Sequence, residues 1–76
     1  MAGDDQPQDF VVHGDHITLD ALLKATGLAA SGGAAKALIA SGAVVVNAAV
    51  ETRRGRKLRP PDEVRVGTAC FRITAA

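Results

Sequence analysis

The spacing of apolar residues predicts a helix early in the chain. Leu19, Leu22 and Leu23 have the i, i+3, i+4 spacing of a helical face that packs against a core. Thr18 precedes them as an N-cap residue, and Gly27 follows as the residue that ends the helix in a left-handed conformation. A first helix is therefore expected between Thr18 and Gly27.

A second helix is predicted from about residue 32 to residue 41. Ser31 can cap its start, Gly42 can end it, and Leu38 and Ile39 are expected to face the core. Several alanines on the same segment would permit close approach of the two helices.

Two glycines, Gly32 and Gly33, occupy the first turn of this second helix. Each costs about 1 kcal/mol relative to Ala in a helix interior, so their presence needs a reason. One explanation is that they leave backbone N–H groups at the positive end of the helix open to a phosphate. The other is that they relieve crowding against a neighbouring helix, and the sequence leaves both open.

Runs of β-branched or alternating residues predict strands at residues 10–12, 44–46, 49–51, 63–66 and 70–73. Asn47 and Ala48 would form a two-residue hairpin turn between the second and third of these strands. Asn tolerates a positive φ but Ala does not, so we expect this turn to be strained or lengthened by a bulge. The segment from Thr52 to Pro61 is predicted to be a loop, with Leu58 as its apolar anchor.

These elements predict one small domain of the α+β class. Residues 1–9 are polar and acidic, and we expect a disordered tail there, followed by a single domain over residues 10–76. A chain of 76 residues buries only about 60% of its unfolded surface, so the predicted stability is modest.

Charge is distributed unevenly, although the net charge is only +1. Residues 1–20 contain five Asp and no Lys or Arg, whereas residues 21–59 contain seven cations and a single acid, Glu51. Five of the cations fall within residues 53–59, where like charges repel one another. Such a cluster indicates an anionic partner, and nucleic-acid phosphate is the commonest, because guanidinium groups match its oxygens two at a time.

Other chemistry is poorly represented in the chain. The single cysteine, Cys70, excludes an internal disulfide and a multi-cysteine zinc site, and a structural thiol is favoured over a reactive one. His13 and His16 could be metal ligands, but a turn with two surface histidines is the preferred interpretation. We expect no cofactor, no metal and no catalytic activity, since no set of catalytic side chains stands out. A long apolar run is also missing, so we expect neither a membrane span nor a secretory signal. The single cysteine fits a reducing, cytoplasmic location.

Three motifs follow one another along the chain: Thr18-Leu19-Asp20-x-Leu22-Leu23-Lys24, then Ser31-Gly32-Gly33-x-Ala35-Lys36-x-Leu38-Ile39-x-x-Gly42-x-Val44-x-Val46-Asn47, then Val50-Glu51-Thr52-Arg53-Arg54-Gly55-Arg56-Lys57-Leu58-Arg59-Pro60. Together they resemble the S4 RNA-binding domain, and most of all the small stand-alone bacterial S4-domain proteins. The resemblance covers about residues 10–73. It departs from the family at two turns, because the family commonly has Asn-Gly in place of Asn47-Ala48 and Pro-Gly-Asp in place of Pro60-Pro61-Asp62.

The resemblance implies an αL-type S4 fold, in which two packed helices are followed by a small, mostly antiparallel β-sheet. It also implies an RNA-binding surface made of the start of the second helix and the loop after the hairpin. By position, that surface would contain Ser31, Gly32, Gly33, Lys36, Arg53, Arg54, Arg56, Lys57 and Arg59. The implied protein binds RNA, with ribosomal RNA as the family analogy. A monomer is expected for so small a domain with no evident spare apolar face.

The residues themselves add an expectation about the kind of RNA. Phe10 and Phe71 are the only aromatic residues, and both fall in strands expected to pack in the core. Base stacking is therefore poorly provided for, and phosphate and 2′-OH contacts to a structured RNA are expected instead. Two alternatives stay open: a module whose basic face binds an acidic protein partner, and a merely solvated charged loop.

Overall fold

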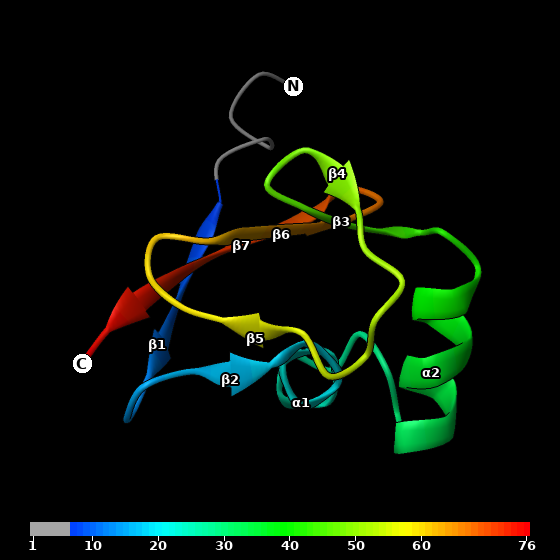
Figure 1. The fold of residues 1–76 in the computed structure, drawn as a ribbon, viewed down its shortest axis with the longest axis horizontal. Helices are drawn as coiled ribbons and strands as arrows, with labels where there is room; N and C mark the ends of the chain where they lie inside the picture. The colour runs from blue at the N-terminus through cyan, green and yellow to red at the C-terminus, as the bar shows by residue number, and fades with distance from the viewer. Residues whose placement is uncertain (1–6) are drawn as a thin grey trace.

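The structure, a computed structural model, describes residues 7–76, which form two layers around a hydrophobic core (Figure 1). One layer is a five-stranded sheet, and the other contains two helices and a two-stranded ribbon. In chain order the elements are β1 (Gln8–Val12), β2 (Ile17–Thr18), α1 (Leu19–Ala25), α2 (Gly32–Ala40), β3 (Val44–Val46), β4 (Ala49–Val50), β5 (Lys57–Leu58), β6 (Glu63–Val66) and β7 (Ala69–Ala75).

The five-stranded sheet has the order β1-β7-β6-β3-β4. Strand β1 runs parallel to β7, and all other neighbouring strands are antiparallel. Val46, Val64 and Phe71 are register partners across β3, β6 and β7, so they share the face that packs on the core. The α+β class and the mostly antiparallel sheet that the sequence predicted are thus confirmed.

The core is apolar and is formed by both layers. The helices and the ribbon contribute fully buried leucines and an isoleucine, and the sheet contributes valines and Ile73. The largest fully buried side chains are Leu19, Leu22, Leu23, Ile39, Leu58, Ile73, Val44, Val46 and Val64. The predicted leucine stripe of the first helix is therefore confirmed, whereas Leu38 of the second is only partly buried.

Both helices begin and end where the sequence predicted. The Ser31 hydroxyl accepts a hydrogen bond from the backbone N–H of Ala34 at 3.1 Å, which caps α2. Gly27 and Gly42 follow the two helices with φ of 81° and 83°, the left-handed conformation that glycine adopts without strain. Thr18 occupies the N-cap position of α1, but its side chain makes no capping hydrogen bond.

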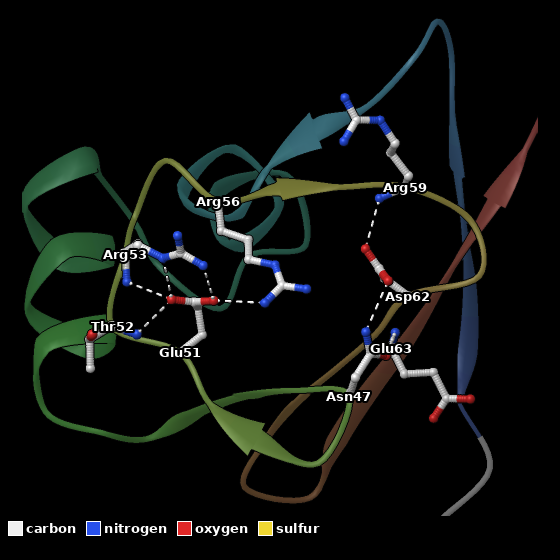
Figure 2. A network of polar contacts seen from close by, with 8 residues as sticks. All are labelled: Asn47, Glu51, Thr52, Arg53, Arg56, Arg59, Asp62 and Glu63. Carbon is white, nitrogen blue, oxygen red and sulfur yellow. Dashed lines mark hydrogen bonds and ion pairs between the residues drawn. The ribbon is translucent and has the colours of Figure 1, made fainter.

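The turn between β3 and β4 contains two residues only, so the predicted alternative of a bulge is wrong and that of strain is confirmed. Asn47 has φ of 51° and Ala48 has φ of 72°, and the left-handed region costs a non-glycine residue about 1–2 kcal/mol. The Asn47 side chain fixes this turn, because it donates to the Asp62 carboxylate and accepts from the Glu63 backbone N–H, both at 2.9 Å (Figure 2).

Two sequence predictions need correction. The first strand begins at Gln8, inside the predicted tail of residues 1–9, because its backbone pairs with β7 whatever the polarity of its side chains. The rest of that predicted tail, residues 1–6, lies outside the described residues. In addition, Lys57 and Leu58 form a strand inside the predicted loop, since they pair with Thr18 and Ile17 of β2.

Candidate functional site

The five clustered cations lie on one loop, residues 52–59, which we call the basic loop. It leaves β4, passes beside α2 and ends in and just after β5 (Figures 1 and 2). Two backbone hydrogen bonds fix it to the start of α1: the N–H of Leu19 donates to the carbonyl of Arg56 at 2.9 Å, and the N–H of Asp20 donates to that of Arg54 at 3.0 Å. Because first-turn N–H groups have no partner within their own helix, the basic loop caps α1 where the Thr18 side chain does not.

The carboxylate of Glu51 accepts hydrogen bonds from both the backbone and the side chains of the basic loop (Figure 2). Only 7% of Glu51 is exposed, and its Oε2 accepts hydrogen bonds from the backbone N–H groups of Thr52 and Arg53 and from Nε of Arg53, at 3.0–3.1 Å. Its Oε1 accepts one from Nη1 of Arg56 at 2.8 Å. The hydrogen bonds from Arg53, followed by the one from Arg56, lower the pKa of Glu51 from 4.5 to about 2.

Acid should therefore weaken the fold through Glu51. Its pKa is lower in the folded state, so its contribution is complete above the unfolded pKa of 4.5 and is lost as the pH falls toward the folded value of about 2. We expect the free energy of unfolding, measured by urea denaturation across this range, to fall less steeply in Glu51→Gln than in the wild type. Equal pH dependence in the two proteins would contradict this role for Glu51.

Beside Glu51, the surface forms an open depression lined by Arg53, Gly55, Arg56 and Lys57. The side chain of Arg53 is 75% exposed and that of Arg56 is 29% exposed, so both reach solvent while contacting Glu51. Gly55 has no side chain that could occupy the depression. Three cationic residues thus line a space open to an anion.

Arg59 has a different partner from the rest of the basic loop. Its Nε and Nη2 donate to Oδ2 of Asp15, at 3.1 and 3.0 Å, and Asp15 also contacts Nδ1 of His16 at 3.1 Å. The hydrogen bonds from Arg59 and His16 lower the pKa of Asp15. Because this pair is largely exposed, water and salt screen it, and an external anion can compete for Arg59.

The remaining cations of the expected RNA-binding surface are all exposed: Arg54, Lys57 and Lys36. Within residues 7–76, none of the three makes an ion pair with a carboxylate. Arg54 and Lys57 belong to the basic loop, and Lys36 lies on α2, the helix beside which that loop passes.

Ser31, Gly32 and Gly33 are exposed at the start of α2. A Cβ placed on Gly32 would meet nothing within 4 Å, and one on Gly33 would meet only the Ser31 hydroxyl at 3.9 Å. Crowding therefore does not explain these glycines, and that alternative from the sequence is wrong. The start of α2 and the turn of the basic loop lie toward the same end of the molecule (Figures 1 and 2).

Sequence reasoning missed the two acids that hold the cations, Glu51 and Asp15. For Glu51 a signal existed, because it is the only acid in residues 21–59 and immediately precedes the cation cluster. For Asp15 there was none, since it lies 44 residues from Arg59 in the chain.

The structure also places the histidines and the cysteine that the sequence offered as other site candidates. Residues 7–76 hold no cluster of three His, Cys, Asp or Glu side chains that could bind a metal. His13 is exposed, and Cys70 is a buried free thiol. None of the helices within this range is long and apolar enough to cross a membrane.

In a comparison with protein families, the model described as S4 domain matches residues 10–74 of the 76-residue chain. A search of curated proteins found no significant match.

Proposed function

The chain belongs to the S4 domain family of RNA-binding modules, and from this premise we propose that it binds structured RNA through the basic loop. One observation carries the proposal: Arg53, Arg56 and Lys57 line an open depression. Arg54 lies on the same loop, with its charge unpaired among residues 7–76. Phosphates spaced along an RNA backbone complement such a set of cations.

The absence of an exposed aromatic platform in residues 7–76 favours a structured RNA over a single strand. Phe10 packs against the core, and Phe71 lies on the core face of β7, both partly buried. Proteins that bind single strands commonly stack bases on exposed aromatic rings. Here recognition would rest on phosphates and 2′-OH groups arranged by the shape of an RNA helix.

Several finer features belong to the same proposal. The chain would adopt the αL-type S4 arrangement and act as a cytoplasmic monomer, binding RNA without transforming it. Ribosomal RNA is the candidate ligand by family analogy. Ser31, Gly32, Gly33 and Lys36 would extend the surface from the basic loop onto α2.

Salt dependence of binding tests the proposal. We expect a structured ribosomal RNA fragment to bind the protein with log K falling against log salt at a slope of about −3.5 to −4.5, if the five loop cations each neutralise one phosphate. The affinity should be measured by fluorescence anisotropy over a salt series, with a single-stranded homopolymer as the comparison. Equal affinity for the homopolymer would contradict recognition of RNA structure, and a flat slope would favour an acidic protein partner.

A further inference from the structure

We infer that Glu51 is a positioning residue for RNA binding: its buried carboxylate holds Arg53 and Arg56 so that the depression is preorganised to receive phosphates of the RNA backbone. This inference rests on the proposed function but makes a separate claim. Glu51 is negatively charged and directly precedes a loop that binds an anion, yet the inference assigns it a role that supports binding.

The geometry of the carboxylate supports this role (Figure 2). Arg53 donates to it through Nε at 3.1 Å and through Nη2 at 3.4 Å, while Arg56 donates through Nη1 alone at 2.8 Å. Nη1 of Arg53, and Nε and Nη2 of Arg56, therefore have no partner among the described residues. The Arg53 guanidinium is held through two nitrogens and that of Arg56 through one, and each keeps further donors for a ligand.

Hydrogen bonds to the backbone make the Glu51 carboxylate a fixed support for the two arginines. Glu51 is 7% exposed and also accepts the backbone N–H groups of Thr52 and Arg53, so it is itself fixed to the chain. A long arginine side chain that is already immobilised loses less conformational entropy when a phosphate binds. Without the shared carboxylate, the two arginine side chains would repel each other.

Electrostatics alone predicts that Glu51 weakens RNA binding, which is the opposite of what positioning predicts. The carboxylate is negative and lies beside an anion site, so its removal adds a positive charge to the loop and should tighten RNA binding. Positioning predicts that its removal weakens binding, because two guanidinium groups become mobile. The sign of the change therefore separates the two accounts.

The test is the affinity of Glu51→Gln for a structured RNA, measured by fluorescence anisotropy at constant salt and at a temperature where circular dichroism shows each protein folded. We expect binding to weaken roughly fivefold or more, from the mobility regained by two side chains. The matched control is Asp15→Asn, which adds the same charge but releases the exposed Arg59 and should bind as tightly as the wild type or more tightly.

A mutant cycle adds a measurement that a merely structural role would not change. In an Arg53→Ala/Arg56→Ala background, Glu51→Gln should have no weakening effect on RNA binding, because the side chains it positions are gone. An equal weakening in both backgrounds would overturn the inference, and so would tighter binding by Glu51→Gln in the wild-type background.

A second variant decides the question if Glu51→Gln does not fold. Arg53→Lys/Arg56→Lys keeps Glu51 and the net charge but replaces the planar fork, which can contact carboxylate and phosphate together, by a single ammonium group. We expect severalfold weaker RNA binding, and unchanged affinity would overturn the inference. Failure of the wild type itself to bind RNA would instead contradict the proposed function.

Discussion

Replacement of Arg54 and Lys57 by Ala is expected to weaken binding of structured RNA on the order of tenfold to a hundredfold at moderate salt. Both side chains are exposed, and neither makes an ion pair within residues 7–76, so their loss leaves no carboxylate without its partner. The backbone of Lys57 still pairs with Thr18 in the variant. The effect should therefore appear in binding rather than in stability.

The slope of log K against log salt provides a quantitative test of the loss of Arg54 and Lys57. Loss of two phosphate contacts should make the slope shallower by about 1.4 to 1.8 units. The matched control is Lys24→Ala/Arg65→Ala, which removes two exposed cations from α1 and β6, outside the basic loop. An equal loss of affinity and slope in the control would mean that net charge governs binding and would contradict a site on the basic loop.

Features that depend on neighbours in the sequence could be predicted without a structure. The leucine spacing of α1, the Ser31 cap and the glycines after both helices are determined within a few residues, and all were predicted correctly. The hairpin at Asn47 and Ala48 was also predicted, because β-branched runs and turn residues are local signals. The cation cluster was likewise identified from neighbouring residues, because its five cations fall within residues 53–59.

Features that depend on distant partners could not be predicted. Strand β1 extends to Gln8 only because β7, more than 60 residues later, offers its edge in parallel. The ribbon of β2 and β5 forms because Ile17 and Leu58 meet across 41 residues of chain. No periodicity within either segment specifies these pairings.

In the candidate site, too, features set by neighbouring residues could be predicted, whereas contacts between side chains could not. The sequence identified the cations of the basic loop, but it could not show that Arg53 and Arg56 share the carboxylate of Glu51 or that Arg59 pairs with Asp15. A count of charges therefore treated five cations as equivalent. In the structure they differ, since three have carboxylate partners and two do not within the described residues.

Truncation of Leu58 should have the largest effect on stability, because this side chain joins the basic loop to the core. Leu58 is fully buried between Lys57 and Arg59, both exposed, and pairs with Ile17 in the ribbon. Leu58→Ala removes buried methyl groups and leaves a cavity, which typically costs about 2–5 kcal/mol. For a domain of 76 residues, with a stability of about 4–11 kcal/mol, this is a large share of the total.

The expected result is a fall in Tm of roughly 10–30 °C, measured by circular dichroism or calorimetry. Val50→Ala is the matched control, because Val50 is also an aliphatic residue in a two-residue strand beside the basic loop but is 58% exposed. Its change should stay within about 0.5 kcal/mol. Similar shifts in the two variants would show that the basic loop is not anchored through Leu58. A large shift for Leu58→Ala alone would mean that the cations are held in place by the same core that stabilises the fold.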